Sequence, residues 1–539
     1  MYIKKDKYND IRSIVLRNMR DNGYTEEVFF DTKEPFLYNL KEAVEFAKDY
    51  LALNDDTTIT IIGDYDVDGI CATEIMRRGL CTYIAEEGLK AAVNTRLPRR
   101  FSEGYGLSEK IVDEIDSGLV ITVDNGIASF DAIKKAKNKG LSVIITDHHL
   151  PPIKNGKMVL PDADVILNPH IDPLKSDFED YCGAGLAYRF VKLLNPNKKF
   201  LELLSLASIA TVADIMPLYG ANREMVRNGL ELFNHLKVVP GLKDLMIKLS
   251  IADGHATEDD YGFKIGPTFN ASGRLFDNGA ERVLRLLKMD YDDPKIPFKA
   301  NNLIKTNEER KAITKKDMER VLEHYDGKRP IVIHDEEIGE GIIGLVAGRM
   351  TESYHSPSIV FTKTEKEGII KGSGRSIPEI NLKEVLDKIQ DKIVGYGGHA
   401  GAAGLSIELS KLDDFKDAFE KACGEIPELS KDVYYDMELE VNEIPMVVQE
   451  LNSYAPYGEK NPKILFHMKY EVNPEKFTRI GDGTHFMIKD DVITIMGFGK
   501  ADEYEKKGKP SKLDCVGYLS ESWYNGNCSY KFELVSFND

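Results

Sequence analysis

Three short runs of aliphatic and β-branched residues in the first third of the chain each end in a cluster of aspartate or histidine residues. The runs lie at 58–62, 119–123 and 141–146, and GDYDVDG, DNG and DHH follow them in that order. Stretches with the apolar spacing of helices separate the runs, such as CATEIMRRGLCTYIAEEG after the first. Strands that alternate with helices in this way predict a parallel sheet with helices on its faces.

The clusters place acidic and imidazole side chains at one edge of this predicted sheet. In an open parallel sheet the carboxyl ends of the strands form the ligand-binding crevice. We therefore expect five side chains to converge there: Asp64, Asp66, Asp68, Asp124 and His148.

A sixth candidate comes from a later, strongly apolar stretch, FLELLSLASIATVADIMPL, which is typical of a buried helix. Asp214 falls near the end of that helix, in apolar surroundings where a carboxylate needs a partner. A metal ion would supply that partner.

Metal binding is the economical explanation of the first cluster, because three carboxylates so close together repel one another unless cations or protons neutralise them. An Asx-rich surface turn is the alternative, and the triplet alone leaves the choice open. With Asp124, His148 and Asp214 added, the set is large enough for two metal ions to share. Mixed carboxylate and imidazole ligands suit Mn²⁺ better than the all-oxygen sites that Mg²⁺ and Ca²⁺ prefer.

We therefore expect two divalent cations as cofactors, with Mn²⁺ preferred and Mg²⁺ as a substitute. Two metals about 3.5–4 Å apart activate a bridging hydroxide and stabilise an in-line phosphoryl displacement. The predicted reaction is thus phosphoester hydrolysis. No serine or cysteine nucleophile is required, and no convincing motif for one is present.

Four motifs in the order DYDVDG, TVDNG, TDHH and TVAD (211–214) resemble those of the DHH phosphoesterase superfamily. Its RecJ branch is indicated by RLPRRFSEGYGL at 96–107, GSGRSI at 372–377 and GGHAGAAGLSI at 397–407. This resemblance implies a metal-dependent exonuclease specific for single-stranded DNA. It would work in the 5′ to 3′ direction and release 5′-mononucleotides during DNA recombination and repair.

The resemblance also implies how the ligands are divided. Asp64, Asp66 and Asp124 would hold one cation, while Asp68, His148 and Asp214 would hold the other together with Asp124, which bridges. His149 would lie beside the scissile phosphate or just outside the metal ligands. Asp147 would orient a histidine.

Substrate contacts are predicted from basic and glycine-rich segments. The cluster Arg96, Arg99 and Arg100 would follow the DNA backbone. Arg274 and Arg375 stand in small-residue segments, predicted to be loops, where a guanidinium could clamp a phosphate.

The segment of Gly397, Gly398 and His399 would close over substrate phosphate; a tight glycine-rich turn between a helix and a strand is the alternative. The chain departs from the RecJ pattern at Thr268, where an arginine is usual, and at Gly339, where a histidine is usual. These departures bear on DNA affinity or processivity and leave the metal chemistry unaffected.

The expected fold class is α/β, with two α/β domains flanking a cleft and a C-terminal all-β, OB-like barrel. The predicted domains are 1–240 (DHH catalytic, with an N-terminal extension and a linking helix), 241–428 (DHH-associated, substrate-binding) and 429–539 (OB-like, nucleic-acid-binding). One or two aromatic residues of the last domain are expected to stack on bases, the candidates being Phe486, Phe498, Trp523, Tyr524, Tyr530 and Phe532.

The net charge of −18, from 71 basic and 89 acidic residues, argues against long-range attraction to DNA, so binding must rest on local basic clusters and bound cations.

The six cysteines lack paired C-x-x-C spacing and are expected to be reduced. MYIKKDKYND does not resemble a secretory signal, and the most apolar stretch, 203–213, is too short to span a bilayer, so a cytoplasmic location without membrane insertion is expected.

Single-stranded DNA is the expected partner, and the resemblance adds a single-strand-binding protein and a helicase; a monomer is the default. Three alternatives stay open: a DHH-type oligonucleotide or cyclic-dinucleotide phosphodiesterase, a pyrophosphatase, and a metal-free DHH-like scaffold that only binds DNA. The terminal β module and the arginine segments favour a polymeric substrate. The complete ligand set disfavours the scaffold.

Overall fold

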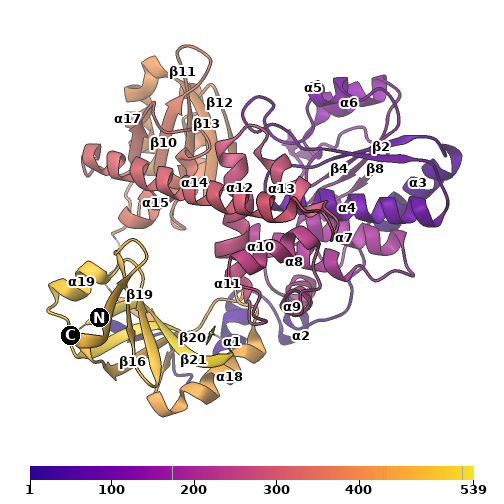
Figure 1. Ribbon diagram of the computed structural model, residues 1–539. Coiled ribbons are helices and arrows are strands. Elements are labelled where there is room, and N and C mark those ends of the chain that lie inside the picture. Colours follow the sequence, from indigo (N-terminus) through magenta and orange to yellow (C-terminus); the bar gives the residue numbers. More distant parts are fainter. Residues whose placement is uncertain (173, 429, 431, 525, 539) are drawn as a thin grey trace.

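The first sheet is built as the strand–helix alternation predicts. The computed structural model describes residues 1–538 except 173, 429, 431 and 525 (Figure 1). Five strands pair in parallel, with every residue of the central strand buried because helices cover both faces. Their order across the sheet is β3 (Ala92–Arg96), β2 (Thr58–Ile62), β4 (Leu119–Val123), β5 (Ser142–Thr146) and β8 (Val165–Leu167).

Two apolar layers enclose this sheet. One side packs against α3 (Leu40–Leu53), α4 (Val67–Glu86) and α7 (Gly183–Leu194), and the other against α5 (Glu109–Asp113) and α6 (Phe130–Asn138). In the sheet, β3 lies on one side of β2 and β4 lies on the other, so the strand order reverses between β2 and β4. Such a switch point opens a crevice at the carboxyl ends of the two strands.

A helical segment continues the same apolar core. The predicted buried helix is confirmed as α8 (Leu201–Ala213), whose C-cap residue is Asp214. A π-helical turn at Tyr261–Ile265 runs directly into α12 (Gly266–Leu275). The other helices of the segment are α9 (Gly220–Asn234), α10 (Pro240–Lys248), α11 (Glu258–Asp260), α13 (Gly279–Leu287) and the long α14 (Ile296–His324).

A second α/β unit follows α14, with the strands β9 and β10 and the helix α15 where they were predicted. Only the pair of β9 and β10 is parallel. The sheet order is β12 (Gly395–Gly398), β13 (Ala402–Glu408), β11 (Ile369–Arg375), β10 (Ser358–Lys363) and β9 (Ile331–His334). The helices are α15 (Ile343–Tyr354), α16 (Leu382–Lys388) and α17 (Leu412–Cys423).

The C-terminal module is a seven-stranded sheet with two long strands at its centre (Figure 1). Its order is β15 (Met437–Glu438), β16 (Leu465–Glu471), β20 (Lys512–Tyr524), β21 (Asn527–Asn538), β19 (Ile493–Gly497), β18 (His485–Lys489) and β17 (Phe477–Ile480), with helices α18 (Ile444–Tyr454) and α19 (Ala501–Lys506). Among the residues that the structure describes, no helix has both the length and the apolar character needed to cross a bilayer.

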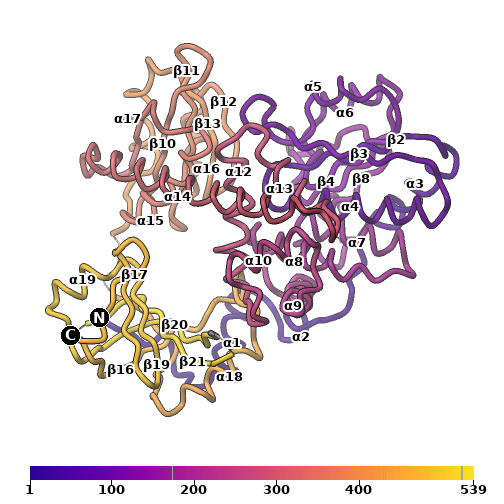
Figure 2. The backbone as a smooth tube through the Cα atoms, viewed as in Figure 1, coloured from indigo at the N-terminus to yellow at the C-terminus, as the bar shows by residue number. Residues whose placement is uncertain are grey.

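The N-terminal segment differs from the expectation that it extends the first domain. The strand β1 (Tyr2–Lys4) pairs in parallel with β14 (Val433–Tyr435), and α1 (Ile11–Asp21) shares the core of the C-terminal module. In Figure 2 the indigo trace runs beside the yellow one before it reaches the first sheet. The physical reason is complementary burial, since the apolar face of α1 packs against α18 and Arg17 pairs with the buried Asp436.

Candidate metal centre

The predicted aspartates and His148 meet at the carboxyl ends of β2, β4 and β5. The Nε2 atom of His148 lies 3.2 Å from Asp124 Oδ1, 3.7 Å from Asp68 Oδ2 and 3.6 Å from Asp214 Oδ2. Asp66 caps the start of α4, where its carboxylate accepts the N–H groups of Asp68 and Gly69. Segments from four distant parts of the chain therefore form one acidic crevice at the switch point of the sheet.

The candidate ligand atoms form three overlapping groups, of which the third consists of Asp124, His148 and His149. The other two fit two neighbouring cations. The ligand atoms of Asp64, Asp66 and Asp124 lie within 4.8 Å of one another, and so do those of Asp68, His148 and Asp214. Asp64 Oδ2 and Asp124 Oδ1 are buried and accept no hydrogen bond from the described residues. A buried carboxylate oxygen without a partner is costly, and a cation would satisfy it.

The backbone at Asp124 lies unusually close to the start of α7. Asp124 adopts a left-handed conformation, with φ of 63°, directly after β4. Gly183 at the start of α7 packs against it, so that a Cβ at position 183 would lie 2.4 Å from Asp124 Cβ. Only glycine fits this contact without a shift.

The first turn of α7 also holds Asp68. The N–H groups of Gly183 and Ala184 donate to the Asp68 carboxylate at 2.6 and 2.7 Å. The positive end of the helix dipole therefore stabilises this buried charge and fixes its direction toward His148.

The pKa values of several carboxyl groups in the crevice are raised, as expected for ligands of a cation site. Burial, and then repulsion from neighbouring aspartates, raises the pKa of Asp64, of Asp66 and of Asp124. Burial followed by the charges of Asp68 and Asp66 raises the pKa of Asp214 to about 8. These carboxylates are stable as anions only beside positive charge.

The two histidines of DHH have different environments. Burial lowers the pKa of His148, which favours the neutral imidazole that binds metal. Burial also lowers the pKa of His149, but the hydrogen bond to Asp147 and the negative charges of Asp147, Asp214 and Asp68 together outweigh burial and raise that pKa to about 9. Asp147 Oδ1 lies 2.8 Å from His149 Nδ1, so the histidine that Asp147 contacts is His149. His149 thus adds a positive charge at the rim of the crevice.

The predicted arginines Arg274 and Arg375 come together, although neither stands in a loop as expected. Arg274 lies in the last turn of α12, and Arg375 ends β11, whose residues pair with β10 on one side and with β13 on the other. The turn before α15 separates them. Arg274 Nη1 donates to Gly341 O at 3.3 Å, and a Cβ at Gly344 would lie 3.1 Å from Arg375 Nη2.

This arginine cluster carries excess positive charge. Burial, and then repulsion from Arg100, Arg310 and Arg375, lowers the pKa of Arg274 to about 9. Arg100 also covers the ring of Tyr65, with its guanidinium carbon 4.6 Å from the ring centre. Cations that repel one another in a partly buried site favour a bound anion such as a phosphate.

Arg96 does not belong to this cluster, and the expectation that it follows the DNA backbone stays a prediction. Its guanidinium pairs with Glu103 at 2.7 Å and with Glu114 at 2.9 Å, and the hydrogen bond to Glu114 is the largest cause that raises its pKa. These two carboxylates neutralise the guanidinium of Arg96. Arg99 is exposed, and the sequence alone could not distinguish it from Arg96.

The glycine-rich segment is a β-hairpin. Gly397 and Gly398 lie in the edge strand β12, paired with Gly404 and Ala403 of β13. His399 is exposed in the turn, where its backbone N–H donates to Ala402 O and its Nδ1 accepts from Gly401. The expectation of a phosphate-binding loop at this hairpin stays a prediction.

Sequence reasoning missed Arg310, because α14 carries no motif, and Tyr105, although it lies in the RecJ-like segment RLPRRFSEGYGL. Arg310 lies in the charged helix α14, and its pKa is lowered by burial and by Arg349 of α15. Thr268, one of the two departures, is buried and accepts from Asn307, which in turn accepts from Arg310. Tyr105 donates to the backbone oxygen of Asp124 at 2.7 Å.

The aromatic residues of the C-terminal module are mainly structural. Phe486 and Phe532 are fully buried, and Tyr530 packs against the same core. Trp523 stacks on His255, with ring centres 3.8 Å apart and parallel planes. Phe498 is 45% exposed and is the best remaining candidate for stacking on a base. The side chain of Tyr524 lies outside the described residues.

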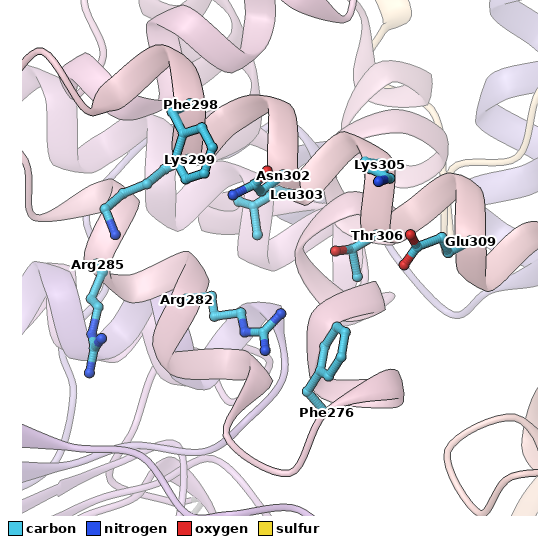
Figure 3. A pocket seen from close by; sticks show the side chains of 10 residues that line it. All are labelled: Phe276, Arg282, Arg285, Phe298, Lys299, Asn302, Leu303, Lys305, Thr306 and Glu309. Atoms are coloured by element: carbon cyan, nitrogen blue, oxygen red, sulfur yellow. The ribbon is translucent and has the colours of Figure 1, made fainter.

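A separate hollow of about 350 Å³ lies between α13 and α14 (Figure 3). Arg282 covers the ring of Phe276 there, with its guanidinium carbon 3.7 Å from the ring centre. Arg285 and Lys299 lie at the other end of the hollow (Figure 3). None of the candidate metal ligands lines it, so it is distinct from the metal centre.

Three family models match successive parts of the chain. The chain matches the DHH family N-terminal domain at residues 58–212, the DHHA1 domain at 328–425 and the RecJ OB domain at 435–536. It is 31% identical to the single-stranded-DNA-specific exonuclease RecJ of Bacillus subtilis over 96% of this chain and 66% of that protein. It is 32% identical to RecJ of Thermus thermophilus over 93% of this chain and 71% of that protein.

A solved structure resembles the fold as a whole. The crystal structure of RecJ in complex with Mn²⁺ from Thermus thermophilus has a TM-score of 0.79 and 26% identity, covering 98% of this chain and 75% of that one. The predicted fold class, two α/β domains followed by an OB-like module, is confirmed. The chain therefore belongs to the RecJ family of single-stranded-DNA-specific exonucleases.

Proposed function

We propose that this protein degrades single-stranded DNA from the 5′ end and releases 5′-mononucleotides by phosphodiester hydrolysis with two divalent cations, Mn²⁺ preferred. The observation that carries the proposal is the pair of ligand groups at the switch point of the first sheet, next to a cluster of arginines that repel one another. Family membership supports the substrate class, and the two neighbouring groups support the number of metals.

The ligand assignment follows the two groups. Asp64, Asp66 and Asp124 would hold one cation, and Asp68, His148 and Asp214 the other, with Asp124 between them. When bound, the cations supply Lewis-acid activation of water and stabilisation of the leaving oxygen. Mixed oxygen and imidazole donors support Mn²⁺ over Mg²⁺.

The protein's own groups orient the substrate and keep the ligands charged. The start of α7 fixes the Asp68 carboxylate, and Asp147 keeps His149 protonated beside the crevice. As a cation, His149 would attract the scissile phosphate. Tyr105 contacts both His149 and the backbone of Asp124 and would hold the imidazole in place beside the metal ligands.

The arginine cluster would bind the terminal phosphates of the strand. Arg274, Arg375 and Arg100 converge from three different elements, and Arg310 adds a fourth cation held through Asn307. Planar guanidinium groups bind phosphate oxygens through two N–H groups at once. A role for Gly397, Gly398 and His399 in closing over the substrate belongs to the same proposal.

The cellular context is proposed from family membership alone. It comprises DNA recombination and repair in the cytoplasm, action as a monomer, and cooperation with a single-strand-binding protein and a helicase. The proposed domain boundaries at residues 240 and 428 can be tested by limited proteolysis, with the N-terminal segment expected to remain with the C-terminal module because the two share a core.

One experiment tests the central proposal. Single-stranded and duplex DNA labelled at either end is incubated with the protein and Mn²⁺, and Asp124→Ala is compared with Asp131→Ala, an exposed aspartate of α6. We expect mononucleotide release from the 5′ end of single strands, loss of activity in Asp124→Ala and retention in Asp131→Ala. Digestion from the 3′ end, or equal digestion of duplex, would refute the proposal. Calorimetric titration with Mn²⁺ tests the stoichiometry, for which two ions per chain are expected.

A further inference from the structure

One continuous helix borders the metal centre and carries an exposed aromatic ring. The π-helical turn Tyr261–Ile265 continues without a break into α12, so the run covers 261–275. Within it, Phe263, Pro267, Asn270 and Arg274 are all at least partly exposed. They are spaced by four, three and four residues, so they lie on one helix face.

The adjacent face of the same helix packs against segments that carry metal ligands. A Cβ at Gly262 would lie 3.8 Å from Val212 Cγ1, and one at Gly266 would lie 3.6 Å from Ala213 Cβ, directly before Asp214. A Cβ at Gly273 would lie 3.2 Å from the backbone oxygen of Tyr65, between Asp64 and Asp66. The helix therefore runs along the metal centre from Asp214 to Tyr65.

Phe263 has no structural reason to be aromatic. Its side chain is 77% exposed, although the same helix buries Tyr261, Ile265 and Phe269. π-Helical turns occur often at functional sites, where they rotate one side chain out of the regular α-helical pattern. Ile215, directly after Asp214, is also 70% exposed. Exposed apolar groups thus flank the Asp214 end of the crevice.

Arg274, at the C-terminal end of the same helix face, indicates which ligand the exposed ring of Phe263 would contact. Arg274 belongs to the arginine cluster that attracts phosphate, and it lies eleven residues (274 − 263) from Phe263. At the rise of an α-helix the two Cα atoms are about 16 Å apart. One helix face therefore offers a cation for phosphate and, farther along, an aromatic surface for an unpaired base.

We propose that Phe263 stacks on a nucleobase of the same single strand whose phosphate Arg274 binds. This inference rests on the proposed function and deepens it, because it names a residue that selects unpaired bases. A base inside a duplex is already stacked on its neighbours and is not available to the ring. Phe263 is thus a positioning residue that contributes to single-strand specificity.

The test uses the full-length protein with Mn²⁺ and oligonucleotides whose first linkages are phosphorothioates, which slows hydrolysis during binding measurements. Phe263→Ala is compared with Phe263→Tyr, which keeps the stacking surface. The matched control is Phe36→Ala, which removes another exposed phenylalanine outside this helix. A series of oligonucleotides carries one abasic position at successive sites along the strand.

Loss of one base–aromatic stack weakens binding by about 5- to 150-fold. We expect this loss in Phe263→Ala, near wild-type affinity in Phe263→Tyr and Phe36→Ala, and unchanged thermal unfolding in all three. An abasic site at one position should weaken the wild type by the same factor and leave Phe263→Ala unaffected.

Binding of Phe263→Ala within twofold of wild type would overturn the inference, and so would equal sensitivity of wild type and Phe263→Ala to every abasic site. In either case the exposed ring serves some other contact, such as one with a protein. Failure of the proposed function is a different result, in which the wild type itself neither binds nor degrades single-stranded DNA.

Discussion

The backbone N–H of Gly183 donates to the carboxylate of Asp68 at 2.6 Å, while the Cα of the same glycine faces Asp124 so closely that no side chain fits between them. One residue at the start of α7 thereby positions two of the candidate ligands. The contribution of Gly183 to ligand position can be measured separately, because a substitution at this residue removes none of the side chains that would bind metal.

Gly183→Ala should therefore impair metal binding without removing a ligand. The added methyl group must displace Asp124 or the first turn of α7, and loss of such supporting contacts typically lowers metal affinity or activity by about 10- to 100-fold. Mn²⁺ titration calorimetry and nuclease rates measure the effect. Gly395→Ala is the matched control, since no atom lies within 4 Å of a Cβ there. Equal Mn²⁺ affinity in the two variants would contradict the prediction.

The metal-free protein should lose stability through Asp214 as the pH rises. The pKa of Asp214 in the folded chain, about 8, lies above its ordinary value of 3.8, so the folded state holds this proton and the unfolded state releases it between these pH values. Stability therefore falls as the pH rises through this range. Asp214→Asn has no carboxyl group to titrate at this position. In chelator, its midpoint temperature of thermal unfolding should therefore rise relative to that of the wild type as the pH increases from about 5 to 8.

Adding Mn²⁺ should reverse that order, because the cation stabilises the ionised carboxylate of the wild type only. Parallel pH profiles of wild type and Asp214→Asn in chelator would show that Asp214 does not titrate in this way.

Replacing Arg274 by alanine should weaken substrate binding, whereas replacing Arg96 should not. Arg274→Ala removes a member of the arginine cluster and should raise the KM for single-stranded DNA by about 10-fold or more, consistent with the loss of a charge-assisted hydrogen bond. Arg96→Ala removes a side chain already neutralised by Glu103 and Glu114, so the KM should stay within twofold of wild type. Steady-state kinetics at constant ionic strength measure both values. A large KM effect in Arg96→Ala would restore the role that the sequence suggested.

His255→Ala should loosen the C-terminal module. His255 stacks on Trp523, the only tryptophan of the chain, so intrinsic fluorescence reports this contact directly. Removing an aromatic partner costs about 0.5–1.5 kcal/mol beyond the buried area. We expect a red-shifted emission and a lower midpoint of thermal unfolding. An emission spectrum identical to that of the wild type would indicate that the two rings do not stack in solution.

The sequence by itself determined the first sheet and the candidate ligands, because both depend on local order. Buried β-branched strands alternate with helices, and the carboxyl ends of parallel strands meet at one edge of the sheet. The order of the chain alone therefore predicts that Asp64, Asp124 and His148 lie close together. Asp214 was predictable for a related reason, since a carboxylate at the end of a strongly apolar helix requires a partner.

Only the tertiary structure decided which basic residues pair with carboxylates and which part of the chain the N-terminal segment packs against. Arg96 and Arg100 are four residues apart, yet Glu103 and Glu114 neutralise the first while Tyr65 and the Arg274 cluster surround the second. The N-terminal helix packs on the far C-terminal module. Side-chain pairing and docking between distant segments depend on three-dimensional proximity, which the local pattern of residues does not encode.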